Sequence, residues 1–174
     1  MRNVGEALAA WCRNIPSLIL TSFILLGCQS VSLEPIGHMV PENKWFFLSQ
    51  SGDQSGTWHG EDLSLDYKYD RYHSHLSISG IIHFAGRIVD NYSIVQYFHL
   101  DAIPVDAQGK VLDMISLTTA GDMNTLYDGP VEFNKILTLP PNTAAIAFSY
   151  RGRAYGSGSY SDGGFMDFWE YPVY

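Results

Sequence analysis

Two histidines separated by a single residue, His73 and His75, are the side chains that most directly suggest metal chemistry. On a β-strand, alternate side chains lie on one face, so the two imidazoles would project side by side. Neutral imidazole is a good ligand for zinc, copper and nickel, and His59 and the Asp66/Asp70 pair are the nearest candidates for further ligands. The sequence contains no His-Glu-x-x-His motif and no cysteine-based zinc pattern. A metal site centred on His73 and His75 is therefore a hypothesis that competes with two exposed histidines beside a turn.

Catalytic patterns find little support. Serines are plentiful, but no Gly-x-Ser-x-Gly motif links a predicted strand to a helix. Glu61 and Asp62 are adjacent, so on a strand they would point to opposite faces and would not form the facing carboxylate pair of a glycosidase. The sequence predicts a protein that is not an enzyme.

The aromatic residues permit two interpretations. Trp45, Trp58, Trp169, Tyr171 and Tyr174 could form a stacking platform for sugars or for a partner peptide, and Trp58, Trp169 and Tyr171 are the leading candidates for such binding. Most of these side chains have a simpler role in closing the core, because aromatic side chains bury a large apolar area.

Cys28 is the residue with the most specific chemistry. It follows an apolar run from Ile15 to Gly27, and Arg2 and Arg13 precede that run. A helix that spans a bilayer needs about 20 apolar residues, so this run is too short to cross one. A basic region, a short apolar segment and a small residue before a break are typical of an export signal.

The four residues Leu25-Leu26-Gly27-Cys28 resemble the lipobox of bacterial lipoproteins, in which a Leu stands three residues before an invariant Cys and Gly or Ala precedes that Cys. Leu26 stands where Ala or Ser is commoner in that family. The resemblance implies that the Cys28 thiol receives a diacylglycerol, that the chain is cut between Gly27 and Cys28, and that an acyl chain is added to the new amino group in many members. A thiolate is a good nucleophile for forming the thioether, and two or three acyl chains anchor a protein more stably than one. No other cofactor is expected.

Removal of residues 1–27 would leave 147 of the 174 residues, enough for one domain with a real core. The net charge would change from −8 to −9, because Arg2, Arg13 and Glu6 would be lost together. So acidic a chain has no electrostatic surface for nucleic acid and would be repelled by anionic lipid, so the lipid anchor would hold it to the membrane. Cys12 lies in the removed segment, so no internal disulfide is expected. Gln29 follows Cys28, and in a bacterium with two membranes this resembles a signal for sorting to the outer membrane.

Residues 28–44 contain two prolines and no sustained period, which predicts a lipidated tether. From Trp45 onward, short alternating runs separated by Gly, Asp, Asn and Pro predict strands. In the clearest run, apolar residues recur at even positions and predict a half-buried strand that is kinked or bulged at Gly80 and Gly86; these residues are Leu76, Ile78, Ile82, Phe84 and Ile88. Further strands are expected in 92–105 and 110–117, joined by a turn at Asp106–Gly109, and in 131–139, 143–152 and 165–174. In 143–152, the residues Ala144, Ile146, Phe148 and Tyr150 would share one face. In 165–174, Phe168 and Trp169 would lie on opposite faces.

Strands of this length with regularly spaced turns predict an all-β fold, an antiparallel β-sandwich over residues 45–174. The order of strands and turns in residues 74–150 resembles the immunoglobulin-like domains of bacterial envelope proteins. This resemblance implies a fold and supplies no active-site residues. The expected protein is a membrane-anchored envelope lipoprotein with a non-catalytic binding, accessory or assembly role, and with an envelope protein or a glycan as partner. The alternatives are a carbohydrate- or peptide-binding module that uses exposed aromatics, and a metal-binding protein.

Overall fold

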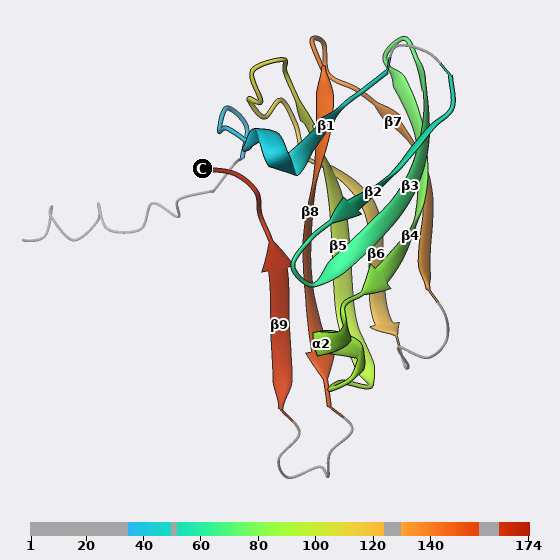
Figure 1. The fold of residues 1–174 in the computed structure, drawn as a ribbon, viewed down its shortest axis with the longest axis vertical. Coiled ribbons are helices and arrows are strands. Elements are labelled where there is room, and N and C mark those ends of the chain that lie inside the picture. The colour runs from blue at the N-terminus through green and yellow to red at the C-terminus, as the bar shows by residue number, and fades with distance from the viewer. Residues whose placement is uncertain (1–34, 50–51, 124–129, 157–163) are drawn as a thin grey trace, which may run out of the picture. The chain divides into compact units, whose positions relative to one another are not determined.

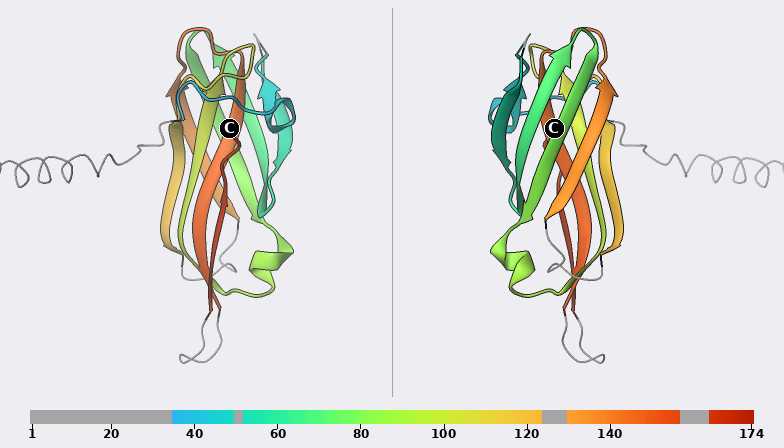
Figure 2. Two further views of the ribbon diagram at one scale, coloured as in Figure 1. Left: turned by 90° about the vertical axis from the view of Figure 1, so that its left-hand side faces the viewer. Right: turned by 90° about the vertical axis from the view of Figure 1, so that its right-hand side faces the viewer.

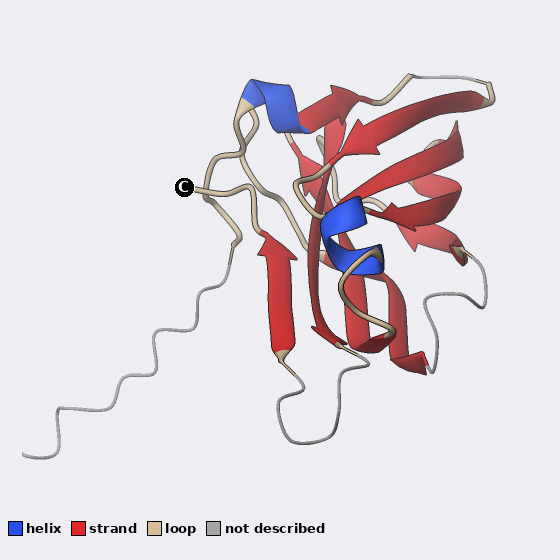
Figure 3. Cartoon of the chain, turned by 60° about the horizontal axis from the view of Figure 1, so that its bottom comes forward, coloured by secondary structure: helices blue, strands red, loops and turns tan. Residues whose placement is uncertain are grey.

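The computed structural model describes residues 35–49, 52–123, 130–156 and 164–174, which form nine β-strands and two short helical turns (Figures 1 and 3). The strands are β1 (Trp45–Phe47), β2 (Gln54–His59), β3 (Leu63–Tyr72), β4 (His75–Phe84), β5 (Ile94–Val105), β6 (Ile115–Met123), β7 (Val131–Thr138), β8 (Ala145–Tyr155) and β9 (Phe165–Glu170). The helical turns are η2 (Glu42–Lys44) and α2 (Gly86–Val89).

The strands pair into two antiparallel sheets that face each other (Figure 2). The first sheet has the order β1-β8-β5-β6, and β9 also pairs with β8. Because β5 occupies one side of β8, β1 and β9 follow one another along the other side, at residues 145–147 and 150–155. The second sheet has the order β2-β3-β4-β7. The antiparallel β-sandwich that the sequence predicts is confirmed.

Aromatic side chains fill much of the space between the sheets. Along β8, Ile146, Phe148 and Tyr150 belong to this core, as the sequence predicts, while Ala145 and Ala147 between them are buried in a separate cluster. Trp58 belongs to the same core: it is 8% exposed, and its ring centroid lies 5.6 Å from that of Phe148. Its indole N–H donates to the carbonyl oxygen of Lys44 at 3.3 Å. The prediction of Trp58 as a ligand-binding residue is therefore wrong, because its ring closes the core.

Strand β4 ends at Phe84, before the alternating pattern of the sequence does. The backbone turns at Ala85, whose N–H donates to the carbonyl oxygen of Asp62 at 2.7 Å. Ile88, predicted to lie on the strand, is on α2 and is fully buried from there. An apolar residue that continues the period of a strand can thus reach the core from a helical turn that follows it.

Gly80 does not bulge β4, contrary to the prediction. The register with β3 and with β7 is continuous through this residue. A Cβ at this position would lie 2.7 Å from the ring of Phe133 and 2.8 Å from the carbonyl oxygen of Asp66. The absence of a side chain at Gly80 therefore lets the buried ring of Phe133 pack closely against the strand.

Residues 35–44, predicted to be part of the tether, pack onto the sandwich. Met39 and Tyr174 exchange backbone hydrogen bonds of 3.2 and 3.1 Å, and the N–H of Val40 donates to the carbonyl oxygen of Gly109. Val40 joins a buried cluster on the outer face of the first sheet, made with Ile103, Val105, Val111, Ala145 and Ala147. The strap 35–41 therefore covers one end of that outer face. The rest of the predicted tether, residues 28–34, and the predicted leader lie outside the described residues.

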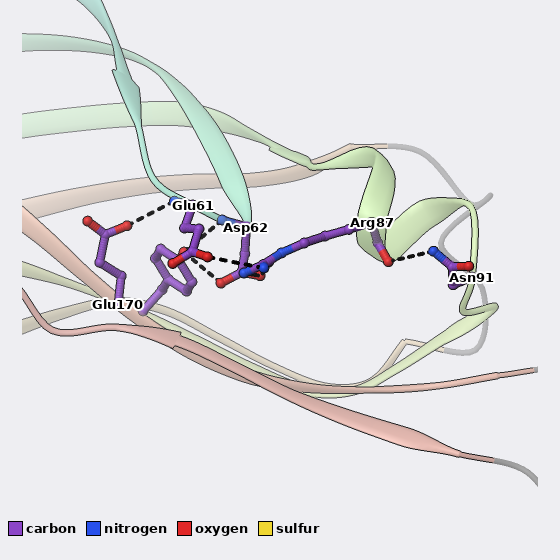
Figure 4. A network of polar contacts seen from close by, with 6 residues as sticks. Glu61, Asp62, Arg87, Asn91 and Glu170 are labelled. Carbon is purple, nitrogen blue, oxygen red and sulfur yellow. Dashed lines mark hydrogen bonds and ion pairs between the residues drawn. The ribbon is translucent and has the colours of Figure 1, made fainter.

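A buried carboxylate connects the β2–β3 loop to α2 and β8 (Figure 4). Asp62 is 1% exposed. Its Oδ1 accepts from Nε of Arg87 at 2.7 Å, and the second guanidinium nitrogen also contacts it. Its Oδ2 accepts from the Tyr150 hydroxyl at 2.9 Å, and its backbone N–H donates to that same hydroxyl. Burial raises the pKa of Tyr150, so this phenol remains a hydrogen-bond donor.

A second carboxylate, that of Glu170, attaches β9 to the other sheet. It accepts from Nζ of Lys44 at 2.5 Å and from the backbone N–H of Glu61 at 3.1 Å. The β2–β3 loop is thereby held against both β8 and β9 (Figure 4). This fixes the position of β9, the strand that carries Trp169 and directly precedes Tyr171, two of the predicted binding residues.

Candidate functional site

Strand β9 and the residue that follows it place Trp169 and Tyr171 on the outer face of the first sheet. Phe168 is 2% exposed in the core, whereas Trp169 is 65% and Tyr171 39% exposed. The opposite faces predicted for Phe168 and Trp169 are confirmed. Trp169 and Tyr171 therefore remain candidates for binding, unlike Trp58.

These two rings border a hollow of about 540 Å³ on that outer face. We call its exposed surface the aromatic face; the residues that define it are Tyr97, Asp101, Met114, Arg151, Trp169 and Tyr171. They come from β5, the segment before β6, β8, β9 and the residue just after β9. The strap and its buried cluster cover the neighbouring end of the same sheet.

The strand register brings two charged groups to the centre of the aromatic face. Arg151 of β8 lies opposite His99 of β5 on one side and opposite Trp169 of β9 on the other. Asp101 lies two residues beyond His99 on β5. Among the described residues, neither Asp101 nor Arg151 has a side-chain hydrogen bond or an ion pair of 4.0 Å or less.

Asp101 is half-buried, and this burial raises its pKa. The charges of Arg151 and His99 act in the opposite direction but do not outweigh the loss of solvation. The ionised carboxylate therefore lies in a place where water solvates it poorly, and in the part of the chain that the structure describes no donor replaces that water. A ligand with hydrogen-bond donors would stabilise it.

A second arginine on the same face is fully paired. Nε and the second terminal nitrogen of Arg153 donate to the two carboxylate oxygens of Asp167 at 2.5 and 2.9 Å. The guanidinium also lies over the ring of Phe165, 4.6 Å from its centroid, and 6.0 Å from the centroid of Tyr97. Arg153 lowers the pKa of Asp167 through this hydrogen bond and its charge. Arg153 thus packs the surface beside the hollow, and of the two arginines described on this face Arg151 is the one available to a ligand.

His73 and His75 do not share the face of one strand. His73 lies in the turn between β3 and β4 with a φ of 56°, and β4 begins at His75. The positive φ breaks the alternation on which the metal-site prediction depends. In the described part of the chain, no group of three or more His, Cys, Asp or Glu side chains could hold a metal ion.

Asp66, suggested as a further metal ligand, is instead part of a small exposed network on the second sheet. It accepts from the Thr57 hydroxyl at 2.6 Å, and its other oxygen lies 3.1 Å from Nε2 of His83. The bond from Thr57 lowers the pKa of Asp66. In a catalytic triad the histidine lies between the acid and the nucleophile, whereas here the carboxylate lies between the hydroxyl and the imidazole. This arrangement does not activate Thr57 as a nucleophile.

Sequence reasoning did not identify Asp101 and Arg151. The alternation of apolar residues in β8 was visible and implies that Arg151 points away from the core. Nothing in the sequence indicates that β5 and β9 flank β8, and that neighbourhood alone brings Asp101, Arg151 and Trp169 together. The predicted lipidation and cleavage positions, Cys28 and Gly27, lie outside the described residues.

Comparisons with protein-family models, with curated proteins and with solved structures give no match for this chain. Within residues 35–49, 52–123, 130–156 and 164–174, no helix has the length and apolar character needed to cross a membrane.

Proposed function

We propose that this protein is a lipid-anchored protein of the bacterial cell envelope whose β-sandwich binds a ligand, without catalysis, on the aromatic face. The observation that carries the binding role is the hollow in which exposed Trp169 and Tyr171 adjoin the unpaired side chains of Asp101 and Arg151. Binding sites in proteins typically combine apolar and aromatic walls with a few convergent polar groups.

Support for the anchor comes from the sequence, which places a lipobox-like Leu25-Leu26-Gly27-Cys28 after a short apolar run. Only six residues, 29–34, separate Cys28 from the first residue of the sandwich unit, Pro35, so the chain takes seven residue-to-residue steps between them. A fully extended chain spans at most about 3.6 Å per residue, so such a tether would reach about 25 Å. The domain would act close to the membrane surface, and the sorting inference from Gln29 favours the outer membrane of a bacterium with two membranes.

Replacing Cys28 with serine tests the anchor. A hydroxyl is a much poorer nucleophile than a thiolate, so Cys28→Ser should abolish incorporation of a labelled fatty acid and leave the leader uncleaved. The measurement is labelling of the expressed full-length protein followed by mass spectrometry of its N-terminus. Cys12→Ser, which changes the other cysteine, should label and mature normally. Equal labelling of the Cys28→Ser protein would refute the lipobox interpretation.

Replacing Trp169 with alanine tests the binding role. The full-length protein in detergent is screened against panels of oligosaccharides and short peptides, and the affinity of any bound compound is then measured by calorimetry. Because the Trp169 ring is largely exposed, its loss should change the free energy of unfolding by no more than about 0.5 kcal/mol. The same loss should weaken ligand binding by roughly tenfold or more.

The matched control is Tyr72→Ala, which removes another largely exposed ring, on β3 of the second sheet. This variant should bind as the unmodified protein does. Binding that survives Trp169→Ala unchanged, or a protein that binds no compound of either panel, would count against the aromatic face as a binding site.

A further inference from the structure

The centre of the aromatic face carries two polar groups for which the described segments provide no hydrogen-bond partner. Asp101 offers hydrogen-bond acceptors and Arg151 offers donors, and neither has a side-chain partner among the described residues. Asp101 is half-buried whereas Arg151 is exposed. A carboxylate that is partly withdrawn from water favours a ligand that restores its hydrogen bonds, and the exposed guanidinium beside it is free to donate to the same ligand. A ligand that fits both groups must therefore accept from a guanidinium and donate to a carboxylate within one small area.

The charges of the aromatic face cancel locally, in contrast to the acidic chain as a whole. Arg153 is neutralised by Asp167, and the remaining pair, Asp101 and Arg151, has no net charge when both are ionised. His99, the neighbouring titratable group, lies 3.0 Å from the Thr119 hydroxyl through Nδ1. A ligand with a net charge of either sign would be attracted by one member of the pair and repelled by the other. The balance favours an uncharged ligand.

The position of these groups within the sheet argues against a peptide that adds as a strand. Asp101 is on β5, which pairs with β6 and β8, and Arg151 is on β8, which pairs with β5 and β9. The backbones of both strands already have neighbours on each side, and strand addition needs a free edge. A ligand in the hollow therefore meets side chains, including the exposed ring of Trp169 beside Arg151.

We infer that the aromatic face binds a neutral carbohydrate, an inference that rests on the proposed function and specifies its ligand. A sugar ring has an apolar face that packs on Trp169, and Tyr171 borders the same hollow. Each hydroxyl of a sugar is both a donor and an acceptor, so neighbouring hydroxyls donate to Asp101 and accept from Arg151. An uncharged, hydroxyl-rich ring meets all three requirements at once.

The test measures binding of the full-length protein in detergent to three sets of probes. The first set contains neutral oligomers of glucose, mannose, galactose and N-acetylglucosamine; the second contains oligomers of uronic acids; the third contains hexapeptides. At least one neutral oligomer should bind. Its affinity should fall roughly tenfold or more in Arg151→Gln and in Asp101→Asn, because each change removes a charge-assisted hydrogen bond to the ligand.

Two exposed charges on the second sheet provide matched controls. Lys68→Gln and Asp70→Asn make the same kinds of change on β3 and should leave affinity unaltered. Arg151→Lys keeps the charge but loses the planar fork, and it should bind more weakly than the unmodified protein and more tightly than Arg151→Gln. Thermal melting of each variant verifies that the sandwich is folded.

The outcomes separate this inference from the function on which it rests. Binding of uronates or peptides in a Trp169-dependent manner, without binding of a neutral oligomer, would overturn the neutral-carbohydrate inference and leave the aromatic face as the site. Binding of a neutral oligomer with the same affinity in Arg151→Gln, in Asp101→Asn and in the unmodified protein would also overturn it. Absence of binding in all three sets, or binding indifferent to Trp169→Ala, would overturn the inference and the proposed function together.

Discussion

Asp62→Ala should destabilise the folded protein by about 2–3 kcal/mol. Asp62 is 1% exposed and accepts hydrogen bonds from Arg87 and Tyr150. Its removal leaves the buried Tyr150 hydroxyl without its acceptor and Arg87 without this carboxylate. The side chain of Arg87 is 43% exposed, so water compensates the guanidinium in part. For this reason the expected loss is smaller than that for breaking a fully buried ion pair.

Urea unfolding followed by far-ultraviolet circular dichroism measures this loss. Asp70→Ala, a change of the same kind at an exposed position of β3, should alter the free energy of unfolding by no more than about 0.5 kcal/mol. Asp62→Asn keeps the shape and one acceptor oxygen and should lie between the two variants. If Asp62→Ala unfolds at the same urea concentration as Asp70→Ala, the network in Figure 4 does not stabilise the sandwich.

Gly152→Ala should destabilise the protein by about 2 kcal/mol or more. Gly152 of β8 lies opposite Phe168 of β9, and a Cβ at this position would come within 2.3 Å of the Phe168 ring. That ring cannot move aside freely. It is 2% exposed and stacks with Phe98 at 6.2 Å, while Tyr150 lies 6.3 Å from it. The added methyl group must therefore displace either a packed ring or a strand.

Gly164→Ala provides the comparison, because a Cβ at Gly164 would meet nothing within 4 Å. Its stability should stay within about 0.5 kcal/mol of the unmodified protein. The double change Gly152→Ala/Phe168→Leu should be more stable than the sum of its single changes predicts, since a smaller side chain makes room for the methyl group. Equal midpoints for Gly152→Ala and Gly164→Ala in a thermal melt would contradict the contact.

Local patterns in the sequence were sufficient to predict the class of fold and to predict which side chains of several strands face the core. Alternation predicts the buried Ile146, Phe148 and Tyr150 of β8, and it separates buried Phe168 from exposed Trp169. These predictions succeed because the period of a strand is a local property that depends only on neighbouring residues.

The failures have physical causes that are not local. Trp58 fits both a ligand platform and a core, and its packing against Phe148, ninety residues away, decides between them. His73 has a positive φ in a turn. Nothing in the sequence marks this turn, because neither Gly nor Asn, the residues that commonly adopt a positive φ, occurs there. Residues 35–44 resemble a linker in composition, but the C-terminal residues of the chain hold them in place.

The candidate site was predictable only in part. Trp169 and Tyr171 were identified by residue type, since exposed aromatics suggest binding. Asp101 and Arg151 were not, because the strand register brings them together from β5 and β8. Residue type can therefore suggest the aromatic residues of such a site. Its polar residues can be identified only when the order of strands in the sheet is known.

The contact between the strap and the C-terminus also has a consequence for the order of events during synthesis. Lys44 and Glu170 pair across 126 residues, and Met39 bonds to Tyr174, which is similarly distant in the sequence. A ribosome delivers the early partner of each pair long before the late one. The β2–β3–β4 meander needs only neighbouring segments and can form early, because short loops close at little entropic cost. The bonds of Met39 to Tyr174 and of Lys44 to Glu170, in contrast, cannot form until residues 170–174 have been synthesised, so these contacts of the first sheet are among the last to form.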